Sequence, residues 1–295
     1  MGLPRIALTV GDPAGIGPEI VAKAAADPAV LAVCKPVVFS TPPEVAVRPG
    51  EVSAAAGRAA YDTIARAVDF ALRGDVDAIA TAPVNKLAFA RAGLKWKGHT
   101  DLLAHLCGAK QVSMMFHSPK LKVVLLTVHV PLKDVAKYIT PELVDQTIAL
   151  TSDAMVGFGT ARPRLALAGL NPHAGESGVL GEEDDRVLVP AVRRARENGI
   201  AIEGPIPGDT VFVRASRGEF DCVIACYHDQ GLIPVKLLSF GHAVNVTIGL
   251  PIIRTSVDHG TAFDIAGQGV ANPGSMIAAV KLAAEMATAR AKARA

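Results

Sequence analysis

The chain has 295 residues, half of them hydrophobic and only 4% aromatic. A sequence of this length and composition can bury a large core and favours two lobes over one. Its formal charge of +2, with 30 Lys and Arg residues against 28 Asp and Glu residues, excludes a general electrostatic attraction to nucleic acid or to a membrane surface.

The four cysteines are scattered and do not suggest a disulfide framework. Cys222 and Cys226 lie in an apolar, strand-like run, where cysteine usually acts as a small hydrophobic residue, so a zinc site that joins them to His228 is disfavoured. The N-terminus carries no signal-peptide pattern, and no run of 18 uncharged apolar residues occurs. We therefore expect a soluble, cytoplasmic protein with no nucleic-acid or membrane partner.

The chain opens with a predicted strand over residues 5–10, which leads through the turn Gly11-Asp-Pro-Ala-Gly-Ile-Gly-Pro-Glu19 into a helix. Such a strand, turn and helix present backbone N–H groups at a helix N-terminus, where anions bind. The turn matches the first half of the dinucleotide-binding fingerprint, but Ile20 stands where the third glycine is required. A tight turn without a ligand is an equally good interpretation.

A second strand is predicted over residues 36–39, a long helix over 54–72 and a third strand over 78–80. The turn that follows ends at Lys86, at the carboxyl end of this third strand. Loops at such strand ends form the ligand crevice of an open α/β sheet. Lys86 is therefore either an active-site residue or an exposed surface lysine.

A helix is predicted to begin after Gly98-His99-Thr100-Asp101. Thr100 or Asp101 is expected to cap this helix, because both side chains can accept hydrogen bonds from its first N–H groups. Capping does not account for His99.

A histidine follows each of three predicted apolar strands, which cover residues 122–128, 164–168 and 223–226. These histidines are His129, His173 and His228, and their shared placement predicts a divalent-metal site with coordination positions left open for a substrate oxygen. Asp229 and Asp258 are candidates for additional carboxylate ligands. A single histidine would more often be a satisfied core or loop residue.

Three further polar residues, Lys236, Asn245 and Arg254, follow at spacings of nine residues. They are too far apart to share one helix face, and Asn245 lies in a predicted strand over residues 244–248. Their chemistry suits convergence on one anion.

Six motifs, in order along nearly the whole chain, resemble those of the 4-hydroxythreonine-4-phosphate dehydrogenase family of pyridoxine biosynthesis. The motifs are Gly11–Glu19, Thr81–Lys86, Gly98–Thr100, Asn171–Glu176, Tyr227–Gly231 and Arg254–Ala262. The resemblance implies an α/β fold like that of isocitrate and isopropylmalate dehydrogenases, with two α/β/α lobes and a cleft between them. It implies a discontinuous first lobe of residues 1–97 plus 256–295, and a second lobe of residues 98–255 that holds the metal and substrate residues and the interface of a homodimer.

The resemblance also assigns roles to residues. His129, His173 and His228 match the family's ligands for one divalent ion, such as zinc, magnesium or cobalt, with the third histidine reaching in from the other subunit. The matching substrate contacts are His99, Thr100, Lys236, Asn245 and Arg254.

The implied activity is a metal-dependent, NAD- or NADP-linked oxidation of 4-phosphooxy-L-threonine at C3, followed by decarboxylation to 3-amino-2-oxopropyl phosphate, in pyridoxal 5'-phosphate biosynthesis. The metal polarises the reacting oxygen, and the cationic side chains hold the phosphate. Lys86, Asp209 and Asp229 are the candidates for the general base, and the sequence does not separate them. The dinucleotide is assigned by resemblance to the segment that contains Asp258, Gly267, Gly269 and Asn272.

Other substrates and functions are compatible with parts of the pattern. Members of the same family oxidise D-threonate or D-erythronate 4-phosphate, or cis-dihydrodiol dicarboxylates. A phosphate acyltransferase-like enzyme of related fold, or a noncatalytic phosphate-binding protein, would need neither the three histidines nor a redox cofactor. The chain also departs from the family between residues 40 and 53, where it is shorter than usual, although none of the matched residues lies there.

Overall fold

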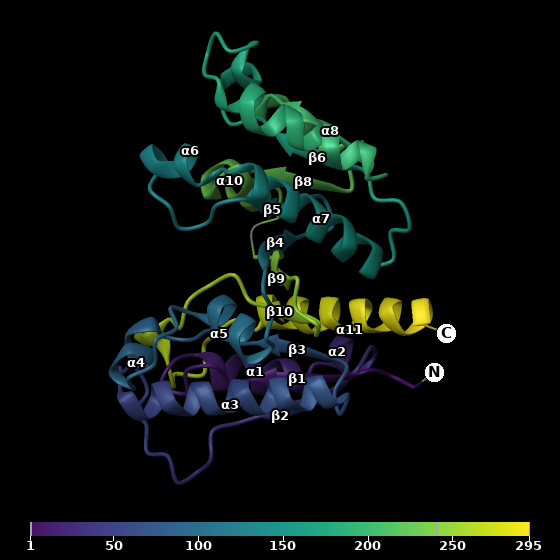
Figure 1. The fold of residues 1–295 in the computed structure, drawn as a ribbon. Coiled ribbons are helices and arrows are strands. Elements are labelled where there is room, and N and C mark those ends of the chain that lie inside the picture. The colour runs from purple at the N-terminus through teal and green to yellow at the C-terminus, as the bar shows by residue number, and fades with distance from the viewer. Residues whose placement is uncertain (1, 240, 295) are drawn as a thin grey trace. The chain divides into compact units, whose positions relative to one another are not determined.

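The computed structural model describes residues 2–239 and 241–294 (Figure 1). The chain forms two compact units, each with its own core. Unit 1 comprises Met1–Val112 and Val244–Ala295, and unit 2 comprises Ser113–Ala243. Unit 1 is therefore discontinuous, and residues 98–112 and 244–255 belong to it. The two lobes inferred from the resemblance stay a prediction.

Unit 1 contains a sheet segment whose strands follow the order β2-β1-β3-β10-β9. All neighbours are parallel except β9 and β10, which are antiparallel. The strands are β1 (Arg5–Thr9), β2 (Lys35–Phe39), β3 (Ala78–Thr81), β9 (Val244–Ile248) and β10 (Arg254–Ser256).

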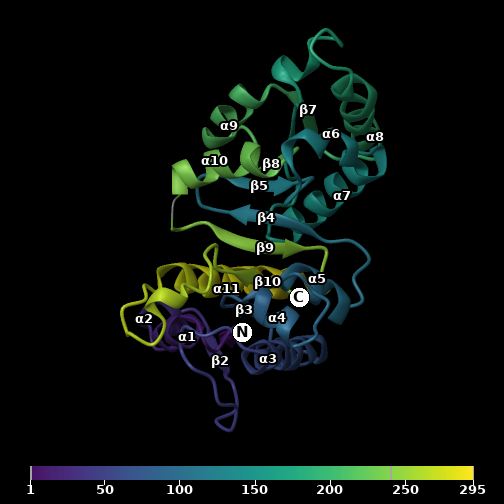
Figure 2. The same ribbon diagram turned by 90° about the vertical axis from the view of Figure 1, so that its left-hand side faces the viewer.

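The helices of unit 1 cover both faces of these strands (Figure 2). One face carries α1 (Gly17–Ala25), α2 (Pro28–Leu31) and α11 (Gly274–Arg294), and the other carries α3 (Ala54–Arg73), α4 (Lys86–Arg91) and α5 (His99–Leu106). A short 3-10 helix, η4, covers Phe263–Ile265. No helix among the described residues is both long and apolar enough to cross a membrane.

Local signals explain the predicted helix α3. The Ser53 hydroxyl accepts a hydrogen bond from the N–H of Ala56 and so caps its first turn. Gly74, with φ of 80°, ends it in the left-handed conformation that favours glycine. The apolar side of the helix packs Ile64 and Val68 against Ile79 of β3 in the core of unit 1.

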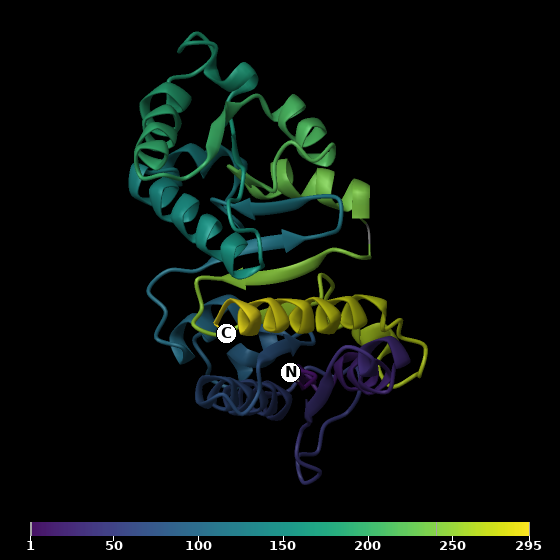
Figure 3. The same cartoon turned by 90° about the vertical axis from the view of Figure 1, so that its right-hand side faces the viewer.

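Unit 2 contains strands in the order β4-β5-β8-β6-β7, parallel except for the hairpin of β4 and β5. They are β4 (Ser113–His117), β5 (Lys122–Leu125), β6 (Leu165–Ala168), β7 (Ile202–Ile206) and β8 (Cys222–Ala225). Helices α7 (Pro141–Gly157) and α8 (Val189–Glu197) lie on one face, and α9 (Gly208–Ser216) and α10 (His228–Ser239) on the other (Figure 3).

The remaining elements of unit 2 are short. They are the 3-10 helices η1 (Leu132–Asp134) and η2 (Pro172–Gly175), the π-helix η3 (Asp184–Leu188) and the one-turn helix α6 (Val135–Tyr138). Val123, Ala166 and Val223 from neighbouring strands form the centre of the unit's core. The carboxyl ends of β5, β6 and β8 lead into the loops that carry the three predicted metal ligands.

Candidate active site

Arg254 is the most unusual charged residue of unit 1. Only 2% of it is exposed, and none of the ion pairs among the described residues includes it. Its Nη1 donates to the Thr247 hydroxyl (2.9 Å) and its Nη2 to the Thr81 hydroxyl (2.7 Å), while its buried Nε has no hydrogen-bond partner among the described residues. Burial lowers the pKa of Arg254 to about 9, because the charged form loses its hydration. At neutral pH the side chain is still a cation, and its hydrogen-bond partners among the described residues are neutral hydroxyl groups.

Two other predicted substrate contacts of unit 1 also have buried atoms without partners. These atoms are Nε2 of His99, at the start of α5, and Oδ1 of Asn245, on β9. Burial, reinforced by the nearby Arg254 charge, lowers the pKa of His99 well below its ordinary value, so this imidazole is neutral at pH 7. Unsatisfied buried polar atoms are rare, and these lie on the residues expected to hold one anion. A phosphate would supply acceptors for the guanidinium and the imidazole together.

The start of α5 differs in detail from the expectation. Gly98 is its N-cap, and the Asp101 carboxylate reaches back to accept hydrogen bonds from the N–H groups of Lys97 and Gly98. Thr100 lies in the first turn and makes no capping bond. The assignment of Thr100 as a substrate contact stays a prediction.

In unit 2, the structure brings His129 and His228 together, with their ring centroids 5.8 Å apart. Two imidazoles that bind one ion through nitrogens at about 2.1 Å would have centroids roughly 5–6 Å apart. The pair therefore fits a shared divalent ion. Because both rings belong to one chain, the expectation that His228 completes the partner subunit's site stays a prediction.

Asp229 contacts His228 directly, with its Oδ1 2.6 Å from the His228 Nδ1. A carboxylate on one ring nitrogen fixes the tautomer and leaves the other nitrogen for a metal ion. Asp229 thus has the position of a residue that orients a ligand, which weighs against its use as a free general base.

The third predicted ligand, His173, lies in η2 with φ of 52° and ψ of 27°. Among the described residues, no group of three His, Cys, Asp or Glu side chains is gathered at one point, so His173 is not joined to the pair. The left-handed conformation of a non-glycine residue is uncommon and costs free energy, and such residues cluster at functional sites.

The remaining candidates lie at exposed positions. Lys86 is the first residue of α4, Asp209 lies in the first turn of α9, and Lys236 lies on α10. An acidic residue near a helix N-terminus, as at Asp209, also has a plain structural explanation. The choice of base therefore stays a prediction.

The segment assigned to the dinucleotide is an exposed loop that two side chains of α1 hold in place. The Lys23 Nζ donates to the carbonyls of Gly269 (2.9 Å) and Ala271 (2.8 Å), and the Glu19 carboxylate accepts from the N–H of Ala271 (2.8 Å). Lys23 and Glu19 also pair with each other at 2.7 Å. Sequence analysis included Glu19 in a motif but gave neither residue a role.

Other residues of this loop act locally. Gly267 and Gly269 both have φ of 77°, which favours glycine. The Asp258 carboxylate accepts a hydrogen bond from Ser275, and the Asn272 side chain accepts one from the N–H of Gly274 at the start of α11. A dinucleotide site at this loop stays a prediction.

Asp12, in the turn that follows β1, was given no role from the sequence. It is fully buried, and burial raises the pKa of its carboxyl group. One oxygen accepts from the N–H of Ala14, and the other has no partner among the described residues. Its place in the Gly-Asp-Pro turn, directly after an apolar strand, was the available signal.

Comparisons with known proteins all point to one family of dehydrogenases. A family model described as "Pyridoxal phosphate biosynthetic protein PdxA" matches residues 18–283. A D-threonate 4-phosphate dehydrogenase of Cupriavidus necator is 43% identical over 329 aligned positions, which cover 98% of this chain and 99% of the relative. A crystal structure of a 4-hydroxythreonine-4-phosphate dehydrogenase from Klebsiella pneumoniae has a TM-score of 0.90 and 41% identity, and the match covers 97% of this chain and 98% of that one.

A more distant likeness concerns the fold alone. An isocitrate dehydrogenase from Methylococcus capsulatus has a TM-score of 0.54 at 18% identity, with 99% of this chain and 88% of that chain covered. The fold is therefore of the isocitrate/isopropylmalate-dehydrogenase type, as expected.

The alignment with the Cupriavidus relative also bears on chain length. Its 329 positions exceed the 295 residues of this chain by 34, so the relative has at least 34 residues without a counterpart here. Residues 40–53, where the shortening was expected, contain no helix or strand. Within this segment, the N–H of Gly50 donates to the Ala14 carbonyl at 2.7 Å.

Proposed function

Because the chain belongs to the PdxA family of dehydrogenases, we propose that it oxidises a four-carbon acid phosphate with a divalent metal ion and NAD or NADP. The first candidate is 4-hydroxythreonine-4-phosphate, as in pyridoxal 5'-phosphate biosynthesis. Its C3 alcohol would be oxidised to a ketone, and a base of the chain would take the hydroxyl proton. NAD or NADP, when bound, would supply the hydride acceptor. The resulting 2-amino-3-oxo-4-phosphooxybutanoate has its carboxylate β to the ketone, so it loses carbon dioxide and gives 3-amino-2-oxopropyl phosphate.

The observation that carries the proposal is the buried guanidinium of Arg254, which has no carboxylate partner among the described residues. Desolvating a cation is costly unless an anion compensates it. A phosphate group carries the needed charge and can accept from His99 and Arg254 at the same time. In this proposal Asn245 and Thr100 add neutral hydrogen bonds to the same substrate, and Lys236 adds a second cation.

The metal ion would be held by His129, His228 and His173. The spacing of the first two rings and the orientation of His228 by Asp229 support this assignment. When bound, the ion supplies Lewis-acid polarisation of the substrate oxygen in both the oxidation and the decarboxylation. The chain's own contribution is to fix the ligand atoms and to provide the base, for which Lys86 and Asp209 are the better candidates because Asp229 is engaged by His228.

D-Threonate 4-phosphate is the second candidate substrate, because relatives of similar identity carry both names. The two substrates share the phosphate and the carboxylate and differ at C2, which carries an amine in one and a hydroxyl group in the other. The phosphate-binding residues of unit 1 therefore do not discriminate between them. Oxidation of D-erythronate 4-phosphate or of a cis-dihydrodiol dicarboxylate is a weaker alternative, and membership of a dehydrogenase family disfavours the acyltransferase and noncatalytic alternatives.

A homodimer is part of the proposal. Ile233 and Leu237 are 65% and 83% exposed and lie one helical turn apart on α10, the helix that begins with His228. Exposed apolar pairs at this spacing are typical of helices that pack against a partner. A second copy of the chain is the partner that the family resemblance implies.

The decisive experiment follows NADH or NADPH formation by absorbance, with the purified protein, a divalent ion and each of the phosphorylated substrates in turn. We expect reduction with one 4-phosphate substrate and loss of the signal with a chelator. The dephosphorylated substrate serves as the matched control and should be turned over far less efficiently. Equal turnover of phosphorylated and dephosphorylated substrates would refute the assignment of Arg254, and turnover that resists the chelator would refute the metal site.

A further inference from the structure

The loop that carries His173 has an unusual backbone. Four non-glycine residues between β6 and η3 have positive φ values, namely His173 (52°), Ala174 (53°), Glu176 (45°) and Ser177 (55°). Each such residue costs roughly 1–3 kcal/mol and persists only where the surroundings enforce it. Something in unit 2 must therefore hold this loop in its strained form.

Asp184 is the buried residue that hydrogen-bonds to the start of this loop. Its side chain is fully buried at the start of η3, although it belongs to the acidic run Glu182–Asp185. Its Oδ1 accepts from the N–H of Leu170 (2.8 Å), and its Oδ2 accepts from both the N–H and the side-chain Nδ2 of Asn171 (3.0 Å each). Three hydrogen bonds to one buried carboxylate thus fix the two residues that begin the His173 loop.

The loop is also closed tightly around this carboxylate. A methyl group added at Gly169 would lie 2.8 Å from Ala174 and 3.1 Å from the Asp184 Oδ1. One added at Gly175 would lie 2.9 Å from the Gly181 carbonyl oxygen and 3.3 Å from the Asp184 Cβ. The loop therefore packs closely against itself, at Ala174 and Gly181, as well as against Asp184, and glycine suits both positions.

Two side chains connect this loop to the strand ends that carry the other histidines. Gln230 donates to the Gly169 carbonyl (2.7 Å) and accepts from the N–H of Cys226 (2.7 Å), which links the end of β6 to the end of β8. The Thr127 hydroxyl donates to the Cys226 carbonyl (2.8 Å), which links the segment after β5 to the same point. The segments leading to His129, His173 and His228 are thus cross-linked by side chains outside the ligand set.

We infer that Asp184 is a positioning residue that sets the His173 loop for metal binding. The inference rests on the proposed function, because it assumes that His173 is a ligand. Asp184 acts on His173, the proposed metal ligand, through Asn171 and the backbone. In this inference it contacts neither the metal ion nor the substrate. Outer partners of this kind typically change metal affinity by roughly 10- to 100-fold when replaced.

The variant Asp184→Asn tests this inference. It keeps the size of the side chain but replaces an acceptor oxygen with an NH2 group, which then faces an N–H donor of Leu170 or Asn171. Asn171→Ala is the milder second variant, because it removes the side-chain bonds to Asp184 and Glu183 and leaves the backbone bond to Asp184 in place. Asp185→Asn is the matched control, since Asp185 is the exposed neighbour of Asp184 and the charge change is the same.

The readout is cobalt(II) binding by the full chain, followed by the visible absorption that reports on coordination, together with circular dichroism. We expect Asp184→Asn to bind cobalt roughly 10- to 100-fold more weakly and with an altered spectrum, Asn171→Ala to show a smaller loss, and Asp185→Asn to match the unsubstituted chain. Should Asp184→Asn fail to fold, an unchanged cobalt affinity in Asn171→Ala would overturn the inference.

The same titration separates the inference from the proposed function. If the unsubstituted chain binds cobalt and His173→Ala binds it weakly, the proposed metal site stands, and equal affinity in folded Asp184→Asn and the unsubstituted chain would overturn only the role of Asp184. If the unsubstituted chain does not bind cobalt, or if His173→Ala binds it as well as the unsubstituted chain does, the assignment of His173 fails and the inference fails with it.

Discussion

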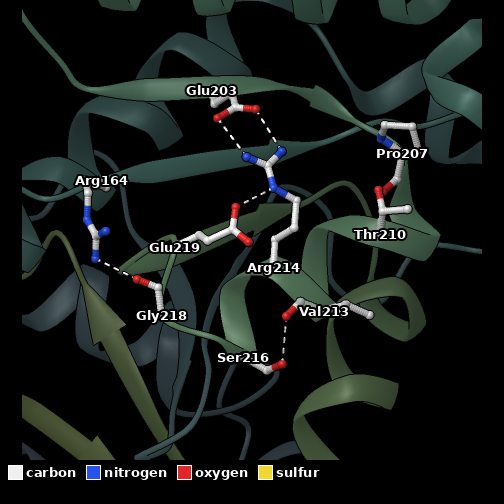
Figure 4. Close-up of polar contacts among 9 residues, drawn as sticks. All are labelled: Arg164, Glu203, Pro207, Thr210, Val213, Arg214, Ser216, Gly218 and Glu219. Atoms are coloured by element: carbon white, nitrogen blue, oxygen red, sulfur yellow. Dashed lines mark hydrogen bonds and ion pairs between the residues drawn. The ribbon is translucent and has the colours of Figure 1, made fainter.

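Arg254 in unit 1 and Arg214 in unit 2 show two opposite ways of placing the same side chain. Arg214 lies on α9 at the surface and donates to two carboxylates, Glu203 and Glu219, at 2.8–3.1 Å (Figure 4). These partners raise its pKa above the ordinary value. Arg254 is buried, donates only to threonine hydroxyls, and has its pKa lowered to about 9 by burial.

The difference distinguishes Arg214, which pairs with carboxylates of the protein, from Arg254, which is proposed to bind a ligand. Arg214 finds its anions within the protein, where they tie α9 to β7 and to the turn that follows α9. Arg254 is desolvated without receiving an anion from the described residues, which supports its proposed role in binding an anionic substrate. The local environment, rather than the residue type, thus indicates which arginine serves function.

Replacing each arginine with glutamine gives the largest expected contrast. Removal of one partner from a buried, charge-assisted contact costs roughly 2–5 kcal/mol, so Arg254→Gln should lower kcat/KM for the phosphorylated substrate by about 30-fold or more. Arg214→Gln should leave kcat/KM unchanged and slightly lower the melting temperature, because its ion pairs are exposed. Steady-state kinetics and thermal unfolding of both variants provide the measurements.

Melting temperatures measured with and without phosphate test the difference between Arg254 and Arg214 directly. Inorganic phosphate should raise the melting temperature of the unsubstituted chain and of Arg214→Gln, and have much less effect on Arg254→Gln. A phosphate effect that survives in Arg254→Gln would mean that the buried guanidinium is not the anion site.

Metal binding tests whether a carboxylate that is hydrogen-bonded within the protein can also serve function. Asp229 pairs with His228 much as the glutamates pair with Arg214, yet we expect Asp229→Asn to weaken metal binding by roughly 10- to 100-fold because it releases the orientation of the ring. His228→Ala should abolish measurable binding, and His242→Ala, which changes another exposed histidine of unit 2, should have no effect. Metal content after dialysis distinguishes these outcomes. Full metal retention in His228→Ala would remove this residue from the ligand set.

The Lys23–Glu19 pair combines features of Arg214 and Arg254. The two residues pair with each other within the protein, as Arg214 does with its glutamates, and they also hold an exposed loop with a proposed binding role. Lys23→Met removes the bonds to the carbonyls of Gly269 and Ala271. If this loop binds the dinucleotide, KM for NAD or NADP should rise by roughly 10-fold, with KM for the phosphorylated substrate unchanged. An equal rise in both constants would point to a general loosening of unit 1 instead.

The sequence predicted the parts of the molecule that follow hydrophobic periodicity. The strands before Gly11, Thr81 and His129 and the long helix after Ser53 were found because their apolar residues recur at the expected spacing. The predicted strand over residues 122–128 was too long, since β5 ends at Leu125. The apolar run beyond that point is part of a loop.

The elements that sequence analysis missed depart from that pattern. Strand β10 is a buried strand of three polar residues, Arg254–Ser256, whose side chains hydrogen-bond to neighbouring elements. Asp184 is the one fully buried residue of an acidic run that would ordinarily be solvated. Functional and strained positions are where local sequence rules are expected to fail.

The sequence also predicts only part of the candidate site. A histidine after an apolar strand is visible in the sequence, and so is the regular spacing of Lys236, Asn245 and Arg254. The left-handed backbone of His173 and the threonine partners of Arg254 depend on contacts between residues far apart in the chain. No local pattern encodes such contacts.

A further expected effect, on stability and not on catalysis, concerns two neutral histidines, His99 in unit 1 and His117 in unit 2. Burial, with a smaller contribution from Lys122, lowers the pKa of His117 to about 4, and burial together with Arg254 lowers that of His99. Below pH 6.5 the unfolded chain therefore binds protons that the folded chain does not, so the free energy of unfolding falls as the pH decreases. His117→Gln should remove up to about 2 kcal/mol of the loss between pH 7 and pH 5, and His99→Gln should act in the same direction.

The addition of phosphate distinguishes the effect of His99 from that of His117. An anion bound beside His99 favours its protonated form, so saturating phosphate should reduce the acid-induced loss of stability in the unsubstituted chain and in His117→Gln. The same phosphate should leave the pH dependence of His99→Gln almost unchanged. Denaturant unfolding at pH 5 and pH 7, with and without phosphate, measures the effect. If phosphate changes the pH dependence of His99→Gln as much as that of His117→Gln, the anion does not contact His99, and the two histidines are alike in being neutral only because they are buried.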